Sequence, residues 1–318
     1  MQRAFVFPGQ GSQQVGMGRA LAEAFPTARA VFEEVDDALS QRLSALMFEG
    51  PQERLTLTEN AQPALMAVSV AVMRVLQRDG GLDLPARALC VAGHSLGEYS
   101  ALCAAGALDL ADTARLLRLR GSAMQAAVPV GEGAMAALLG LDLETARAVA
   151  EDACAAPDGS REVCAAANDN APGQVVVSGH KGAVQRAVAL SAERGGKRGQ
   201  MLPVSAPFHC PLMAPAAEAM AEALERTTIA PPVLPVVANV SARPEQDPTT
   251  LRKLLVEQVT GTVRWRESVL AMKEMGVEEL VEAGSGKVLS GLARRIDPAL
   301  KGVSLGEPAD IEAFLARI

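Results

Sequence analysis

The sequence is poor in aromatic side chains and in residues that commonly bind metals. Only 3% of its 318 residues are Phe, Trp or Tyr, and only three are His. Neither a CxxC pair nor a Cys–His set with metal-ligand spacing occurs. The five cysteines are Cys90, Cys103, Cys154, Cys164 and Cys210. We therefore expect reduced thiols in a cytoplasmic protein, without a metal or a bound cofactor.

An excess of basic residues and a long apolar run are also missing. The formal net charge of -7 argues against nucleic acid or an anionic membrane surface as the main partner. No uninterrupted apolar run reaches the roughly 18–20 residues of a membrane helix. The opening MQRAFVFPG leads straight into a strand-like segment, so we expect no signal peptide. Apolar residues nevertheless make up 49% of the chain, enough for a substantial core.

Short apolar segments alternate with helix-like segments, as is typical of an α/β fold. AFVFPG (4–9), ALCVAG (88–93) and VEELVEAG (277–284) have the composition of buried strands, with helical patterns between them. Because helical crossovers join parallel strands, we expect a parallel-sheet core with helices on both faces. We assign this core to residues 1–129 and 200–318.

The residues between these two parts follow a different order. A strand and a helix are followed by two strands, another helix and a final strand, and the turn-rich NAPG joins the two central strands. The order βαββαβ is that of the ferredoxin-like unit. We therefore expect an inserted ferredoxin-like subdomain at residues 130–199.

The stretch VAGHSLGEYSA places Ser95 between two glycines, where an apolar run meets a helical one. G-x-S-x-G at a strand–helix junction is the pattern of a nucleophile elbow, as in α/β-hydrolases. The glycines permit a sharp turn, and backbone N–H groups at a helix start stabilise negative charge. The alternative is an ordinary turn whose serine caps the helix. The combination of strand, elbow and helix favours a nucleophile.

A serine nucleophile needs a base, and the chain offers three histidines. His94 adjoins Ser95 and should point away from it, while His180 opens a helix of the insert. His209, in SAPFHCPLM, lies in a loop downstream of the serine, as the Ser…His order of such folds requires. We therefore expect His209 to be the base. No Asp stands out between Ser95 and His209, so the group that orients the imidazole could instead be a backbone carbonyl.

Two glycine-rich loops fail as nucleotide fingerprints. After FPGQGSQ comes Gln14, where a dinucleotide motif needs its third glycine. In and before EAGSGKVL, Val281 and Val288 stand where a phosphate loop needs Gly and Ser or Thr. Both follow strands, so we expect them to be walls of one crevice at the carboxyl ends of the sheet.

RLLRLRG contains three arginines at the end of a helical segment, namely Arg115, Arg118 and Arg120. Most such arginines form a solvated face near the helix C-terminus. One that is buried and faces the crevice would bind a substrate carboxylate through two hydrogen bonds. The spacing does not say which one.

Several segments, spread over nearly the whole chain, follow one another in a known order: FVFPGQGSQ, AGHSLGEY, LRLRGSAMQ, NDNAPGQVVVSG, PFHCPLM, LVEQVTGTVRW and GKVLSGL. Together they resemble malonyl-CoA:acyl carrier protein transacylases, the acyltransferase family of fatty acid synthesis. The resemblance implies a hydrolase-like α/β core with a ferredoxin-like insert, in agreement with the strand pattern.

The resemblance also implies roles for individual residues. Ser95 becomes the acyl-accepting nucleophile and His209 its base. Arg120 becomes the group that binds the free malonyl carboxylate. Gln258 matches the position whose main-chain carbonyl orients the histidine.

Two backbone N–H groups, those of Gln10 and Leu96, match the oxyanion hole of the family. Ser285, in GSGKVL, departs from the proline that the family commonly has there, which should alter the stiffness of the loop. Phe208, before His209, together with Leu96 resembles the malonyl-selective pattern, and its ring should crowd a methyl branch.

The implied reaction moves the malonyl group of malonyl-CoA to the phosphopantetheine thiol of acyl carrier protein through malonyl-Ser95. We expect a monomer whose partner is this carrier, with neither nucleic acid nor membrane involved. The alternatives are an acyltransferase of a polyketide or malonate decarboxylase system, a serine thioesterase or other hydrolase, and a non-catalytic carrier-binding module.

An acidic carrier would need a local basic patch on this acidic chain. The candidates are Arg194, Lys197 and Arg198 at the edge of the insert, with Lys287 near the crevice. A merely solubilising turn is the alternative.

Overall fold

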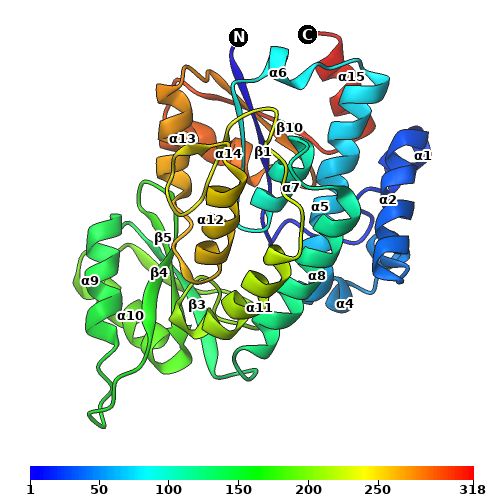
Figure 1. The fold of residues 1–318 in the computed structure, drawn as a ribbon. Coiled ribbons are helices and arrows are strands. Elements are labelled where there is room, and N and C mark those ends of the chain that lie inside the picture. The colour runs from blue at the N-terminus through cyan, green and yellow to red at the C-terminus, as the bar shows by residue number, and fades with distance from the viewer.

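A six-stranded sheet forms the centre of the larger body of the molecule (Figure 1). The computed structural model describes all residues, 1–318. The first five strands of the sheet are parallel and the last, a short edge strand, is antiparallel to its neighbour. In spatial order they are β10 (Lys301–Leu305), β9 (Glu279–Ala283), β1 (Arg3–Phe7), β2 (Cys90–Gly93), β7 (Val236–Val237) and β8 (Pro244–Glu245).

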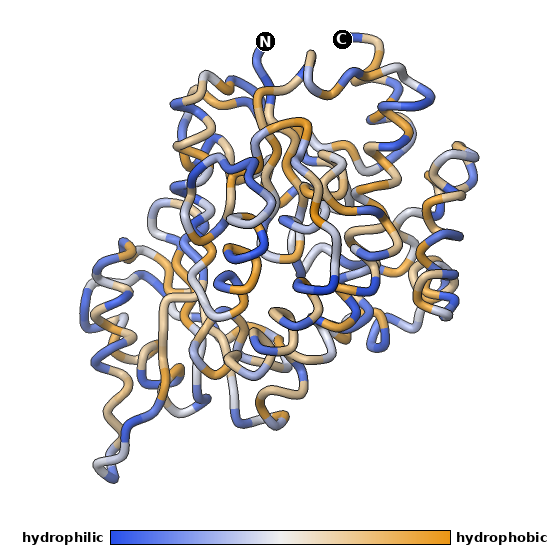
Figure 2. Tube along the Cα trace, viewed as in Figure 1, coloured by the Kyte–Doolittle hydropathy of each residue, from blue (hydrophilic) through white to orange (hydrophobic).

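Strand β1 shows why both faces of this sheet need cover. Phe5 and Phe7 belong to one buried apolar cluster, whereas Ala4 and Val6 belong to another, because successive side chains of a strand point to opposite faces. Figure 2 shows apolar segments running through the interior of this body. The predicted parallel-sheet core with helices on both faces is thereby confirmed.

The larger of these two clusters lies under helices from all parts of the chain. They are α1 (Arg19–Ala24), α2 (Pro26–Leu39), α3 (Leu43–Glu49), α4 (Gln52–Thr56), α5 (Thr58–Arg74) with a π-helical turn (Val75–Asp79), α6 (Leu84–Arg87), α7 (Gly97–Ala104), α8 (Leu110–Ala126), α11 (Ala214–Glu225) after a 3₁₀ turn (Pro211–Met213), α12 (Pro248–Thr260) and α15 (Pro308–Leu315). The opposite face is covered by α13 (Trp265–Glu274) and α14 (Val288–Ile296). None of these helices is both long enough and apolar enough to cross a membrane.

The insert has its own antiparallel sheet and its own apolar cluster. Its elements follow the predicted order, and the four strands lie side by side as β4-β5-β3-β6. They are β3 (Gly133–Leu139), α9 (Leu143–Ala153), β4 (Cys164–Ala171), β5 (Gln174–His180), α10 (Lys181–Glu193) and β6 (Arg198–Met201). The βαββαβ unit is confirmed. β6 runs just past residue 199, and the subdomain boundaries stay a prediction.

The insert is joined to the core on the side where the parallel strands end. The N–H of Asp169, on β4, donates a hydrogen bond to the carbonyl of Val263, and the side chain of Asp169 pairs with Arg266 at 2.9 Å. In Figure 1 both chain termini lie at the far end of the core, away from the insert. The loops that follow β1 and β2 therefore face the junction between the two bodies.

Candidate active site

Ser95 sits at a sharp turn between β2 and α7, with the left-handed φ of 52° that few residues other than glycine adopt. The two flanking glycines make this turn possible. A Cβ on Gly93 would lie 1.9 Å from the backbone of Gly97, and one on Gly97 would lie 2.3 Å from the carbonyl oxygen of Phe7. Because neither position can hold a side chain, the sequence G-x-S-x-G follows from the geometry.

His209 contacts Ser95, with 2.7 Å between the serine Oγ and the imidazole Nε2. The other ring nitrogen, Nδ1, lies 2.8 Å from the backbone carbonyl oxygen of Gln258. A carbonyl only accepts, so Nδ1 carries the proton and Nε2 presents its lone pair to the serine hydroxyl. The structure thus leaves the imidazole ready to take the proton of Ser95.

The imidazole of His209 is buried, and its protonated form is therefore disfavoured. Burial, followed by the nearby charge of Arg120, lowers the pKa of His209 to about 3. The ring is consequently neutral around pH 7, as a general base must be.

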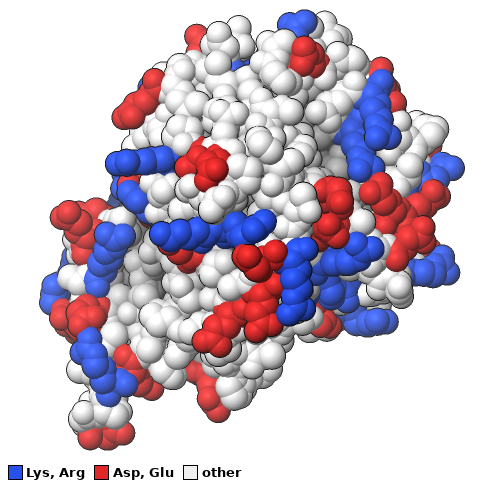
Figure 3. Space-filling model, in the orientation of Figure 1, with Lys and Arg blue, Asp and Glu red and all other residues white.

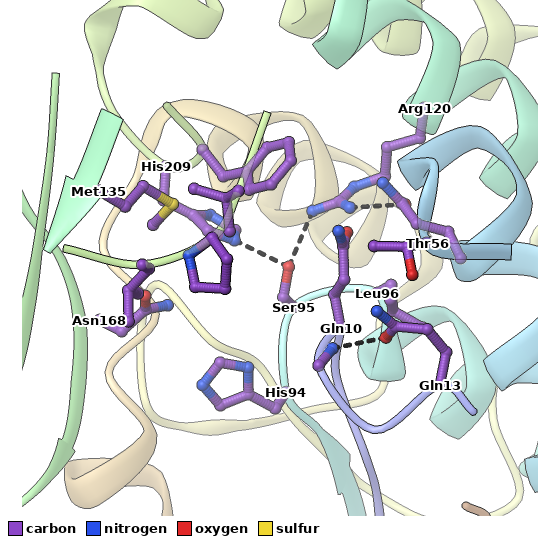
Figure 4. A pocket seen from close by; sticks show the side chains of 16 residues that line it. Gln10, Gln13, Thr56, His94, Ser95, Leu96, Arg120, Met135, Asn168 and His209 are labelled. Atoms are coloured by element: carbon purple, nitrogen blue, oxygen red, sulfur yellow. Dashed lines mark hydrogen bonds between the residues drawn. The ribbon is translucent and has the colours of Figure 1, made fainter. Parts of the chain in front are cut away.

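Arg120 approaches Ser95 from the side opposite to His209 (Figure 4). Its side chain is 1% exposed, and its Nη2 lies 3.2 Å from Ser95 Oγ and 2.8 Å from Gln258 Oε1. Nη1 donates to Gln62 Oε1 at 2.7 Å. These bonds hold the guanidinium beside the serine, with N–H groups left to bind an anion.

Of the three arginines of α8, only Arg120 lines the cavity. Arg115 instead pairs with Asp112 at the surface, at 3.0 Å. The helix phase therefore selects the arginine that the spacing had left open.

Gln258 connects the groups around the serine. Its side-chain Nε2 donates to the carbonyl of Ser95 and to Oε2 of Glu98, both at 2.9 Å. Its Oε1 accepts from Arg120 and its backbone carbonyl accepts from His209. Gln258 thus makes hydrogen bonds to Ser95, His209 and Arg120.

Glu98, in the first turn of α7, is fully buried and was missed in the sequence. Burial raises its pKa to about 7, against the opposing effects of the hydrogen bonds from Gln258 and Asn239 and of the charge on Arg120. Glu98 is the only charged residue of α7 and comes directly after the elbow, which is the signal that could have revealed it.

Asn239 is a second supporting residue that the sequence did not reveal. Its Oδ1 accepts from the N–H of Ser95 at 2.7 Å, and its Nδ2 donates to the carbonyl of Gly93 at 2.6 Å. The backbone N–H of Asn239 donates to Glu98. Asn239 follows β7, the parallel neighbour of β2, so its place after that strand was the available signal.

Ser95 opens onto a cavity of about 490 Å³ between the core and the insert. Gln10 and Leu96 line it, and the backbone N–H of neither makes a hydrogen bond within the protein. Such free donors beside the nucleophile can bind a negatively charged oxygen. Apolar side chains form much of the remaining wall, namely Met135, Leu202, Val204 and Phe208.

The two glycine-rich loops occupy different places. FPGQGSQ contributes Gln10, Gly11 and Gln13 to the cavity wall, but EAGSGKVL contributes no lining residue, contrary to expectation. The second loop instead supports the first, because Ser285 Oγ donates to the carbonyl of Ser12 at 2.8 Å. Ser285 thus ties the two loops together.

The remaining sequence candidates lie outside the serine–histidine contact. His94 points away from Ser95 in Figure 4, and its Nε2 meets Asn170 Oδ1 at 2.8 Å. His180 accepts from the N–H of Val163. No group of three or more His, Cys, Asp and Glu residues lies close enough to hold a metal ion.

Comparison with known proteins agrees with this geometry. The family described as "Acyl transferase domain" matches residues 4–293. The malonyl CoA-acyl carrier protein transacylase of Escherichia coli K12 is 47% identical over 314 residues, which cover 99% of each chain. The crystal structure of an acyl-carrier-protein-S-malonyltransferase from Bartonella henselae is 56% identical, with a TM-score of 0.95, and the match covers 100% of this chain and 99% of that one.

A further solved structure contains a carrier. It is a type II PKS acyl-carrier protein in complex with its malonyl-transacylase, in the holo form. The matched chain is 43% identical to this one with a TM-score of 0.94, and the match covers 100% of both chains.

Proposed function

Because the chain belongs to the malonyl-CoA:acyl carrier protein transacylase family, we propose that it transfers the malonyl group from malonyl-CoA to the phosphopantetheine thiol of an acyl carrier protein. The observation that carries this proposal is the meeting of Ser95, His209 and Arg120 at one cavity. A nucleophile, a base and a buried cation are what the transfer of an acyl group with a free carboxylate requires.

In the first half of the reaction, His209 Nε2 takes the proton of Ser95 as the Oγ attacks the thioester carbonyl of malonyl-CoA. The backbone N–H groups of Gln10 and Leu96 bind the oxygen that becomes negative. Removing one such donor from an enzyme typically raises the activation free energy by about 2.7–4 kcal/mol. The carbon–sulfur bond then breaks, and the leaving thiolate takes the proton from His209. CoA departs and malonyl-Ser95 remains.

In the second half, the phosphopantetheine thiol of the carrier replaces CoA. His209 takes its proton as the sulfur attacks malonyl-Ser95, and the proton returns to Ser95 Oγ as the ester bond breaks. The same base therefore serves both halves, as expected for a ping-pong reaction. No cofactor beyond the two thiols is needed.

Arg120 selects the acyl group. Its guanidinium binds the far carboxylate of the malonyl group while the near carbonyl is attached to Ser95, which is consistent with its position 3.2 Å from Oγ. An acetyl group would offer no carboxylate to the N–H groups of this buried guanidinium that face the cavity. Phe208 lines the same cavity, and its ring leaves less room for a methyl branch on the malonyl carbon.

The partner is an acyl carrier protein, and we propose that it meets exposed basic side chains at the edge of the insert and at the start of α14. Lys197, Arg198 and Lys287 are exposed, whereas Arg194 pairs with Asp152 at 2.6 Å. Figure 3 shows basic and acidic side chains interspersed on the face in view, with no uniformly positive surface there.

Fatty acid synthesis is the pathway we propose, with a polyketide system as the alternative. The observation that supports the polyketide alternative is the likeness to a transacylase in complex with a type II PKS carrier. We further propose a monomer in the cytoplasm. Its five cysteines are all free, as is usual for proteins of a reducing compartment.

The proposed function is tested by mixing the protein with malonyl-CoA and phosphopantetheinylated carrier, and following malonyl-carrier by mass. We expect rapid transfer, and none to carrier that lacks phosphopantetheine or with Ser95→Ala. Malonyl-CoA consumption that yields only free malonate would instead indicate a thioesterase.

A further inference from the structure

Glu98 is a buried charged group that the proposed mechanism does not use. It is 0% exposed, and its Oε2 accepts from Gln258 Nε2 at 2.9 Å and from the N–H of Asn239 at 3.0 Å. Its Oε1 is buried without any hydrogen-bond partner. A carboxylate that is only half satisfied is costly to bury, so its presence here calls for an explanation.

The amide of Gln258 joins Glu98 to Arg120. Its Nε2 faces the carboxylate and its Oε1 faces the guanidinium, so the amide dipole is aligned between a negative and a positive group. The other titratable groups nearby are neutral around pH 7. Burial raises the pKa of Tyr99, the next residue of the same helix, and lowers the pKa of His209 to about 3. Arg120 is therefore the counter-charge of Glu98.

Binding of a malonyl group would change this balance. Its carboxylate and that of Glu98 would then share one guanidinium in a buried site, and like charges there oppose each other. An acetyl group adds no charge and would leave the balance as it is. The charge on Glu98 should therefore weaken the hold of Arg120 on malonyl alone.

We propose that Glu98 is a positioning residue that determines specificity: acting through Gln258, its charge sets how strongly Arg120 holds the malonyl carboxylate. This inference rests on the proposed function. A weaker hold serves a transferase, because an acyl group bound too tightly to the enzyme would not move on to the carrier. Since burial raises the pKa of Glu98 to about 7, its charge changes around neutral pH.

The test is the equilibrium extent of acylation of the protein by malonyl-CoA and by acetyl-CoA, at fixed ratios to free CoA, measured as intact mass. The variant is Glu98→Gln, whose amide oxygen can accept both existing hydrogen bonds and whose NH2 group would occupy the site where Oε1 meets no donor. We expect it to raise the malonyl equilibrium constant about tenfold at about pH 8, and to leave the acetyl constant unchanged.

The pH dependence of the unmodified protein is a second measurement that needs no variant. As pH rises through about 7, Glu98 ionises, so the malonyl-to-acetyl ratio of equilibrium constants should fall. In Glu98→Gln the ratio should stay high and should not change with pH. Glu282→Gln is the matched control, because Glu282 is also a buried carboxylate with a raised pKa, but it binds the start of α14. That control should keep the pH dependence of the unmodified protein.

Three results would overturn the inference. They are a malonyl-to-acetyl ratio independent of pH in the unmodified protein, an equal change for both acyl groups in Glu98→Gln, and the same change in Glu282→Gln. Failure of the proposed function is distinguishable, because the unmodified protein would then form no malonyl adduct at any pH.

Discussion

His209 Nδ1 donates its hydrogen bond to a neutral acceptor, the backbone carbonyl of Gln258, at 2.8 Å. Serine triads commonly use a carboxylate there, which also stabilises the protonated imidazole. Here the carbonyl fixes the ring and its tautomer without adding a negative charge. The positive charge of Arg120 lies nearby, so the environment favours neutral His209.

The pH dependence of acylation should reflect this environment. Since the pKa of His209 is lowered to about 3, the base is not lost as pH falls through the usual histidine range. We therefore expect kcat/KM for acylation by malonyl-CoA to show no decline with an apparent pKa near 6.5 between about pH 8 and pH 5. His209→Ala should lower this rate constant about 10²- to 10⁴-fold. A decline centred near 6.5 that disappears in His209→Ala would contradict the assignment.

Arg120→Ala should impair malonyl transfer far more than acetyl transfer. Removing one partner of a buried charge pair costs about 2–5 kcal/mol, and we expect malonyl kcat/KM to fall accordingly. Arg120→Lys keeps the charge but not the planar fork, so it should recover only part of the loss. The measurement is kcat/KM for both acyl-CoA substrates in each variant. Equal losses for malonyl and acetyl would count against a carboxylate-binding role.

The elbow glycines should tolerate no side chain. Gly97→Ala would place a Cβ 2.3 Å from the carbonyl oxygen of Phe7, so the backbone must move and the free energy of unfolding should fall by about 1–3 kcal/mol or more. Gly291→Ala is the matched control, because a Cβ there, in α14, meets nothing within 4 Å. It should be neutral or stabilising by up to about 1 kcal/mol. Urea unfolding of both variants measures the difference, and similar stabilities would refute the packing argument.

Charge reversal at the edge of the insert should affect only the half of the reaction that uses the carrier. Lys197→Glu with Arg198→Glu is expected to raise KM for the carrier several-fold, while acylation by malonyl-CoA is unchanged. The control is Lys301→Glu, since Lys301 is exposed at the start of β10, at the opposite ends of the parallel strands. A carrier KM that is the same in all three proteins would place the docking surface elsewhere.

Local patterns account for much of the fold. Buried runs such as AFVF and CVAG predict the central strands, because a parallel strand covered on both faces is apolar throughout. The βαββαβ order of the insert follows from its turns and periodicity. The antiparallel edge strand β8 was not predicted, since two residues carry no periodicity and pair only through the tertiary fold.

The residues of the candidate site likewise fall into those that local patterns predict and those that depend on the tertiary fold. Ser95 is predicted by its motif. His209 is predicted as its base because the chain has only three histidines and the other two are poorly placed. Glu98, Asn239 and Gln62 were missed, because each acts through a hydrogen bond to a residue distant in the chain. Hydrogen bonds between residues far apart in the chain depend on how helices and strands pack together, which short motifs do not specify.

The central claim is that Ser95 carries the malonyl group between two thiols. The most direct measurement is the intact mass of the protein after malonyl-CoA, followed by peptide mapping and then by addition of phosphopantetheinylated carrier. We predict a malonyl adduct on Ser95 that persists in buffer and moves to the carrier. An adduct lost to water without the carrier, or no adduct on Ser95, would contradict the account.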